Sequence, residues 1–121
     1  MNELPDLLRQ HLREPRLVGR AEPEHARGVG RNSACGDELV LTATVGEQGA
    51  LALRFRASAC AAVVASASYA VDQLDGSTIE ELSRFDLAQR IEELGGLPRH
   101  RRHAVAVVQR ALEQLAAALR G

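Results

Sequence analysis

Hydrophobic residues recur with helical spacing at both ends of the chain. Over residues 4–12, leucines fall three or four positions apart, which predicts a short amphipathic helix. Residues 101–119 carry a longer stripe with the same spacing, and we expect Arg102, Gln109 and Glu113 to stay in water on the opposite face of that helix. The stripe consists of Ala104, Val107, Val108, Ala111, Leu112, Leu115 and Leu119.

In the first half of the chain, apolar and polar residues alternate over two segments. In residues 39–45 and 51–56, apolar residues recur at every second position, and a turn containing two glycines separates the two segments, which predicts a β-hairpin. Residues 16–30 hold several glycines and a proline. We therefore expect an irregular connection there, ending in a short strand around Val29.

Further helical segments follow the hairpin. Residues 60–74 are rich in Ala and Ser, which favours a helix whose small side chains let it approach the sheet closely. Ser77 or Thr78 can cap a short helix over residues 79–85, and another spans about residues 87–94 before two glycines. The order of helix, sheet and helices predicts an α+β fold, a small three-stranded antiparallel sheet with helices packed on one face.

The amino-acid composition limits the classes of protein to which this chain can belong. The 121 residues fit one domain spanning 1–121, and with 2% aromatic residues its core must come from Ala, Val and Leu. A net charge of −1 and few aromatic rings argue against nucleic-acid binding. The same net charge would not attract the protein to an anionic membrane. The longest apolar run is too short to span a bilayer, and the N-terminus lacks a secretory pattern, so we expect a cytoplasmic protein.

A few side chains could carry chemistry. Cys35 and Asp37 flank a glycine, and a turn there can aim both at one metal ion, although a chance turn explains this short pattern as well. Cys60 opens the Ala-rich helix, where free N–H groups favour a thiolate; the alternative is a small buried residue. His100 and His103 lie among arginines, either on one helix face as ligands or simply solvated.

Arg99, Arg101 and Arg102 form a local basic cluster before the last helix. A solvated surface explains that cluster at least as well as a docking patch for an acidic partner or a chaperone does. Two cysteines in a cytoplasmic chain are more often metal ligands, reactive thiols or core residues than a disulfide.

Three stretches, in order, resemble the NifU/IscU-type iron–sulfur cluster assembly scaffolds. Residues 12–19 followed by residues 28–30 resemble the "NPRNVG … GVG" segment of that family. Residues 32–37 resemble its "N-P-x-C-G-D" motif. Residues 59–68 followed by 74–76 resemble "G-C-x-x-x-x-A-S-x-S … x-x-G-K". The resemblance covers nearly the whole chain.

The resemblance also locates a departure from the family. The family carries a last site on its C-terminal helix, "L-P-x-x-x-x-H-C", and alignment on Leu97 and Pro98 puts His103 on the histidine and Ala104 on the third cysteine. A shift of one residue would put His103 in the place of the cysteine, so the third thiol is missing in either register. Three smaller departures are Ser33 for the usual proline, Ala59 for the glycine and Ser77 for the lysine.

The resemblance implies an IscU/SufE-like fold and a scaffold rather than an enzyme. It implies that Cys35, Asp37, Cys60 and His103 hold iron and a transient [2Fe–2S] cluster, with sulfur from a cysteine desulfurase and delivery to apo-proteins. The same four residues also suit tetrahedral zinc.

Two alternatives stay open. One is a zinc-dependent persulfide acceptor of SufU or SufE type, with Cys60 or Cys35 carrying the sulfur. The other is a divergent member that binds a partner through residues 99–102 without turnover.

Overall fold

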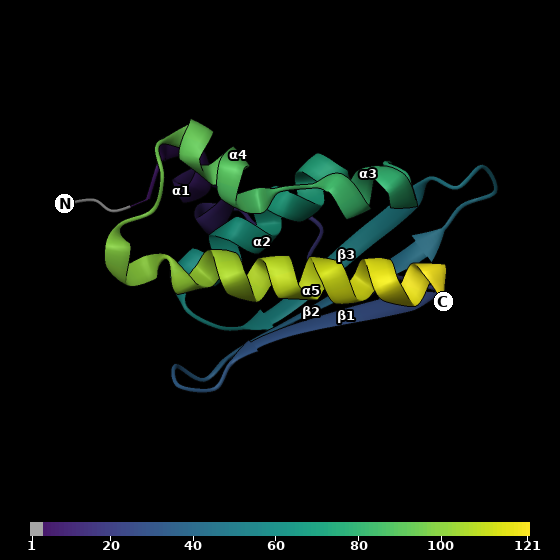
Figure 1. Ribbon diagram of the computed structural model, residues 1–121, viewed down its shortest axis with the longest axis horizontal. Coiled ribbons are helices and arrows are strands. Elements are labelled where there is room, and N and C mark those ends of the chain that lie inside the picture. Colours follow the sequence, from purple (N-terminus) through teal and green to yellow (C-terminus); the bar gives the residue numbers. More distant parts are fainter. Residues whose placement is uncertain (1–3) are drawn as a thin grey trace.

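A computed structural model describes residues 4–121 of the chain. One helix precedes three strands, and four α-helices with one short 3₁₀ turn follow them (Figure 1). The elements are α1 (Asp6–Arg13), β1 (Ala26–Asn32), β2 (Asp37–Val45), β3 (Leu51–Ser58), α2 (Ala61–Leu74), α3 (Ile79–Arg84), α4 (Leu87–Leu94), η1 (Arg99–Arg101) and α5 (His103–Arg120).

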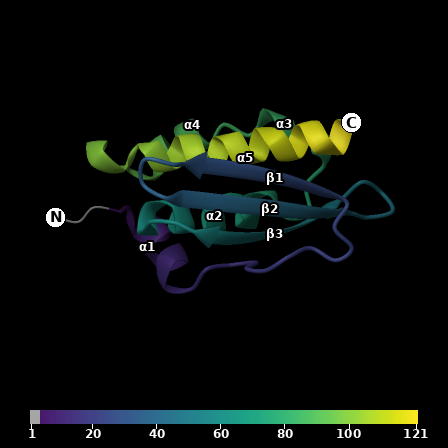
Figure 2. The same cartoon turned by 90° about the horizontal axis from the view of Figure 1, so that it is seen from below.

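The three strands form one antiparallel sheet in the order β1-β2-β3. The hairpin predicted around residues 46–49 joins β2 to β3, with Leu41 opposite Phe55. All the helices lie on one side of the sheet, as the view from below shows (Figure 2). This arrangement confirms the predicted α+β fold with helices on one face.

The strand predicted around Val29 is present, and β1 is centred there, but its seven residues make it longer than predicted. Two of the glycines that suggested an irregular chain, Gly28 and Gly30, serve helix packing. A Cβ built at Gly28 would lie 2.1 Å from the Ala111 carbonyl oxygen, and one at Gly30 would lie 2.0 Å from that of Val107. Only a strand without side chains at these two positions lets α5 rest its backbone against β1.

The prediction for α5 was correct for most of its apolar stripe and wrong for Gln109. Every stripe residue from Ala104 to Leu115 is buried. The Gln109 side chain is only half exposed, and its amide bridges the α3–α4 connection by accepting from Leu87 N (3.1 Å) and donating to Phe85 O (3.3 Å). A polar residue on the predicted wet face thus satisfies two backbone groups of a neighbouring helix pair.

The outer edge of β3 is closed by two loops. Gly19 N donates to Phe55 O (2.8 Å), and farther along the strand Leu51 N donates to Ser77 O (2.8 Å). The Asp75 carboxylate accepts from Leu53 N (2.9 Å). These contacts occupy backbone groups that an edge strand would otherwise offer to other chains.

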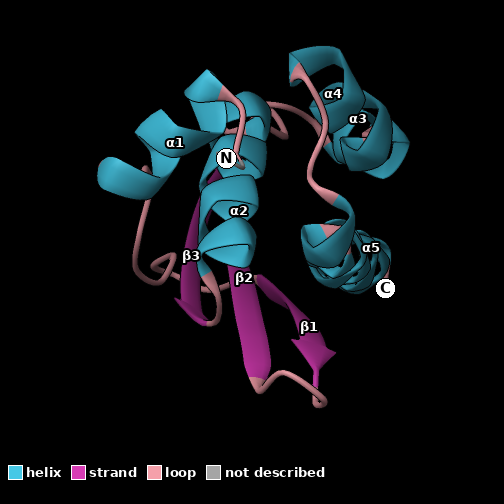
Figure 3. Ribbon diagram, turned by 90° about the vertical axis from the view of Figure 1, so that its left-hand side faces the viewer, coloured by secondary structure: helices cyan, strands magenta, loops and turns pink. Residues whose placement is uncertain are grey.

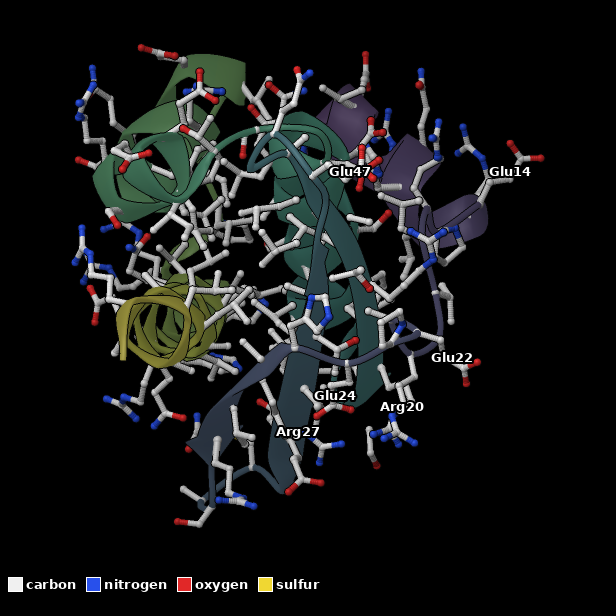
Figure 4. All side chains as sticks on the ribbon, turned by 90° about the vertical axis from the view of Figure 1, so that its right-hand side faces the viewer. Glu14, Arg20, Glu22, Glu24, Arg27 and Glu47 are labelled. Carbon is white, nitrogen blue, oxygen red and sulfur yellow. The ribbon has the colours of Figure 1, made fainter. Side chains whose placement is uncertain are left out.

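Residues 20–25 then cross the face of the sheet that the helices leave open. Ala21 N donates to the Thr42 hydroxyl (2.8 Å), and Thr42 is completely buried as a result. On the same side, Glu24 accepts from Arg20 Nε (2.6 Å) and Arg27 Nε (2.8 Å), and Figure 4 shows these three side chains gathered at the outer face. Both guanidinium groups hold the pKa of Glu24 down to about 2 through these hydrogen bonds, with that of Arg27 contributing most.

α1 is attached to α2 by a buried polar contact. His11 Nδ1 and the Ser68 hydroxyl lie 2.7 Å apart, and the same hydroxyl accepts from Arg16 N (2.7 Å). Burial lowers the pKa of His11, which keeps its ring neutral, and Tyr69 packs edge-on against it. Among residues 4–121, no helix combines the length and apolar character that a membrane crossing requires.

Candidate metal centre

Three separate segments deliver the four predicted side chains to one end of the molecule. Cys35 lies in the turn between β1 and β2, and Asp37 is the first residue of β2. Cys60 is the residue immediately before α2, and His103 is the first residue of α5. In Figure 1 the β1–β2 turn and the starts of α2 and α5 all lie at the left-hand end, and Figure 3 looks onto that end.

Asp37 is the buried centre of this group, with 4% of its surface exposed. Its Oδ1 accepts a hydrogen bond from Cys60 N (2.9 Å), which fixes the start of α2 against the start of β2. Its Oδ2 lies 3.4 Å from His103 Nε2. That second oxygen is buried and has no hydrogen-bond partner among residues 4–121. The carboxylate therefore presents to the imidazole one oxygen that lies at ion-pair distance but forms no hydrogen bond within the described part of the chain.

The two thiols lie around the same imidazole. Cys60 Sγ is 3.6 Å from His103 Nε2. One ligand atom each from Cys35, Asp37 and His103 lies within 4.8 Å of the others. Cys60 falls outside that tight group, but its sulfur contacts His103 and its amide donates to Asp37. The structure thus brings together all four residues that the sequence singled out, three of them in a compact set.

The donor set fits a metal ion. A buried carboxylate oxygen without a partner is costly, on the order of 1–3 kcal/mol or more for a charged group, unless something satisfies it. A cation held between Asp37 Oδ2 and His103 Nε2 would do so. Two sulfurs, one nitrogen and one oxygen also suit the tetrahedral coordination that Zn²⁺ prefers, and iron accepts the same donor types.

Ala104 offers nothing to this centre. It is completely buried and packs in the hydrophobic core beneath α5. His103, one position earlier, reaches the site with about a third of its side chain exposed (29%). His100 is exposed and lies outside the compact group. Of the two candidate histidines, the structure brings only His103 to the thiols.

The basic cluster lies directly before this site. Arg99–Arg101 form the 3₁₀ turn η1, so α5 begins at His103 and not near Arg101 as the sequence predicted. Arg102 Nε donates to Leu97 O (3.4 Å), whereas the Arg101 Nε is buried without a hydrogen-bond partner among residues 4–121. The arginines therefore belong to the segment that leads directly into His103.

Sequence reasoning identified the side chains but missed the backbone features that position them. The hydrogen bond from Cys60 N to Asp37 joins residues that are distant in sequence and leaves no local signal. Gly36, between Cys35 and Asp37, has φ of +74°, a conformation that favours glycine, and its place between these two residues indicated the turn from the sequence.

Iron–sulfur cluster assembly scaffold proteins are similar to this chain in sequence. The iron–sulfur cluster assembly scaffold protein IscU 1 of Archaeoglobus fulgidus is 31% identical over 109 residues, covering 90% of this chain and 71% of that protein. The scaffold protein IscU of Azotobacter vinelandii is 31% identical over 112 residues, covering 89% of this chain and 87% of its own.

Solved structures share the fold. A NifU-like protein (N-terminal) from Brucella abortus superposes with a TM-score of 0.69 at 18% identity, covering 95% of this chain and 90% of that one. A candidate SUF-system assembly scaffold from Fervidobacterium islandicum gives a TM-score of 0.71, also at 18% identity, covering 92% and 94%. The family model described as the NifU-like N terminal domain matches residues 5–120. Because that match spans nearly the whole chain and the relatives exceed 30% identity, the chain belongs to the NifU-like N-terminal domain family.

Proposed function

We propose that this chain is an iron–sulfur cluster assembly scaffold. Cys35, Asp37, Cys60 and His103 hold iron and a nascent cluster, which the protein passes to apo-proteins. The observation that carries the proposal is the buried Oδ2 of Asp37, which has no hydrogen-bond partner among residues 4–121, faces His103 at ion-pair distance and belongs to a carboxylate within reach of Cys35. A site with that geometry favours a positively charged cargo.

The donor chemistry suits temporary storage. Iron–sulfur clusters are held most firmly by thiolates. Here four donors would share a [2Fe–2S] cluster as two ligands per iron, and only two of them are sulfurs. Carboxylate and imidazole ligation weakens the hold on the cargo. The exposed position of Cys35 leaves one side of the site open for transfer.

Partners follow from the same proposal. A cysteine desulfurase supplies the sulfur, and apo iron–sulfur proteins receive the cluster. Arg99 to Arg102 provide a docking surface for an acidic partner or a chaperone, because no carboxylate within residues 4–121 forms an ion pair with these arginines. Their position next to His103 would place such a partner beside the cargo.

A second function is favoured by one specific observation. Ala104 is buried in the core, so this chain has two thiols at the site where the family pattern has three. Two thiols, a carboxylate and an imidazole form a complete zinc site, and Cys35 or Cys60, once it leaves the zinc, could carry a persulfide as in an acceptor of SufU or SufE type.

Anaerobic reconstitution with ferric iron and sulfide tests the proposal. A scaffold develops the visible absorption and circular dichroism of a [2Fe–2S] cluster. When an apo-ferredoxin is added, this signal disappears as the spectrum of the holo-ferredoxin appears. His103→Ala should abolish the signal, whereas His100→Ala, which changes an exposed neighbour outside the site, should leave it intact. Retained zinc, no cluster and a persulfide on Cys35 or Cys60 would instead support the acceptor.

A further inference from the structure

The two cysteines of the sequence meet at one site although 24 residues separate them. Cys60 Sγ lies 3.6 Å from His103 Nε2, and Cys35 Sγ lies within 4.8 Å of a nitrogen of the same ring. Both thiols are free. A single imidazole therefore brings the two sulfur atoms into one neighbourhood.

The two thiols differ in accessibility. Cys35 is exposed in the turn of residues 33–36, whereas Cys60 is half-buried at the start of α2. The Cys60 amide is held by Asp37, which fixes the backbone that carries this sulfur. A solvent-borne reagent therefore meets Cys35 first, and Cys60 lies behind it as the second thiol.

We propose that Cys35 and Cys60 form a peroxide-sensitive modification site, in which oxidation closes a disulfide and shuts the metal centre. The consequence for the metal centre rests on the proposed function, but formation of the disulfide does not. Thiols that are both exposed and close to a resolving cysteine are the ones that oxidants convert reversibly.

The chemistry uses hydrogen peroxide as the oxidant. The Cys35 thiolate attacks one peroxide oxygen, the O–O bond breaks, hydroxide leaves, and the sulfur becomes a sulfenic acid. The Cys60 thiolate then attacks that sulfur, the S–S bond forms, the S–O bond breaks, and a second hydroxide leaves. With the two thiol protons counted, one peroxide is reduced to two waters as two thiols are oxidised to one disulfide.

The strand pairing favours this closure. Glu38 of β2 is paired with Ser58 of β3, so the turn holding Cys35 and the residues leading to Cys60 continue from neighbouring ends of two paired strands. A disulfide requires Cα atoms within about 4.4–6.8 Å of each other, close to the spacing of neighbouring strands. The remaining movement falls on the exposed turn, where a Cβ built at Gly36 would meet no atom within 4 Å.

The closed form has a definite consequence. A disulfide sulfur is a poor metal ligand compared with a thiolate, so oxidation removes two of the four donors at once. The buried Ala104 supplies no third thiol that could exchange with the bond or pair in its place. Conversely, a bound metal engages both thiolates and should protect them from peroxide.

The test uses the full-length apo protein, treated with hydrogen peroxide and analysed by mass spectrometry. The expected product is a monomer lighter by two hydrogens, with a peptide linking Cys35 to Cys60 and loss of zinc binding that dithiothreitol restores. Cys60→Ser should stop at a sulfenic acid on Cys35 that dimedone traps, and Cys35→Ser should leave Cys60 largely reduced. Zinc loaded beforehand should slow the reaction about tenfold or more, because a metal-bound thiolate is not free to attack.

Two results would overturn this inference: oxidation that yields mainly disulfide-linked dimers, or trapping of the first sulfenic acid on Cys60 rather than Cys35. Cluster reconstitution on the fully reduced protein is a separate measurement. A reduced protein that assembles no cluster but still closes the disulfide would reject the scaffold function and leave the modification site standing. The opposite pair of results would reject the modification site alone.

Discussion

Gly30→Ala is the substitution that should most clearly reveal how α5 is held. The new Cβ would lie 2.0 Å from the Val107 carbonyl oxygen and 3.0 Å from its carbonyl carbon, whereas ordinary contacts begin at 3.4 Å. Both partners are backbone, so no side chain can rotate away and α5 must move outward from β1. Forcing extra atoms into a packed interface typically costs about 1–3 kcal/mol, which exceeds the roughly 0.5–1 kcal/mol that alanine gains over glycine in a strand.

We therefore expect Gly30→Ala to lower the free energy of unfolding by about 2 kcal/mol or more in urea denaturation. The same shift should weaken zinc binding, because Val107 lies one helical turn after His103 and both move with α5. Arg31→Ala on the exposed face of the same strand removes an ion pair with Glu38 and should cost less than about 1 kcal/mol. Unfolding free energies for Gly30→Ala and Arg31→Ala that agree within error would refute the close-packing argument.

Three further substitutions test other parts of the structure. Ser66→Ala should leave stability unchanged or raise it by roughly 1 kcal/mol in urea, because the buried Ser66 hydroxyl has no partner among residues 4–121; a clear loss would reveal an overlooked hydrogen bond. Thr78→Ala should cost about 1 kcal/mol by thermal denaturation, because Thr78 forms a capping box with Glu81 at the start of α3, and an unchanged Tm would contradict that role. The pKa of Glu24 is lowered from 4.5 to about 2, so its contribution to stability is present above pH 4.5 and is lost as the pH falls toward 2. Glu24→Gln should flatten the pH dependence of unfolding over that window, and an unaltered slope would show that the pairs with Arg20 and Arg27 do not form in solution.

The sequence predicted the elements whose pattern is local. The hairpin of β2 and β3 followed from alternation, and the stripe of α5 followed from helical spacing, because each pattern faces a single core. The length of β1 was underestimated, because glycine is a weak strand former. Gly28 and Gly30 are needed for close contacts with α5, which is distant in sequence. The prediction that Gln109 stays in water was wrong for a similar reason, because its hydrogen-bond partners belong to the α3–α4 connection.

The candidate site shows the same division. Family resemblance selected Cys35, Cys60 and His103 from a sequence in which each alone was ambiguous. The burial of Asp37, and the split of its two oxygens between the Cys60 amide and the imidazole, could not be predicted, since both depend on how three loops converge. That Ala104 lies in the core did follow from the amphipathic phase of the last helix.

The central claim is that four side chains from three segments form one metal centre, and X-ray absorption at the zinc edge of the zinc-loaded protein tests it most directly. The account predicts two sulfur ligands at about 2.3 Å and two nitrogen or oxygen ligands at about 2.0–2.2 Å. His103→Ala should change the nitrogen shell while His100→Ala leaves the spectrum unchanged. A zinc ion with fewer than two sulfur ligands, or a spectrum that His103→Ala does not alter, would contradict it.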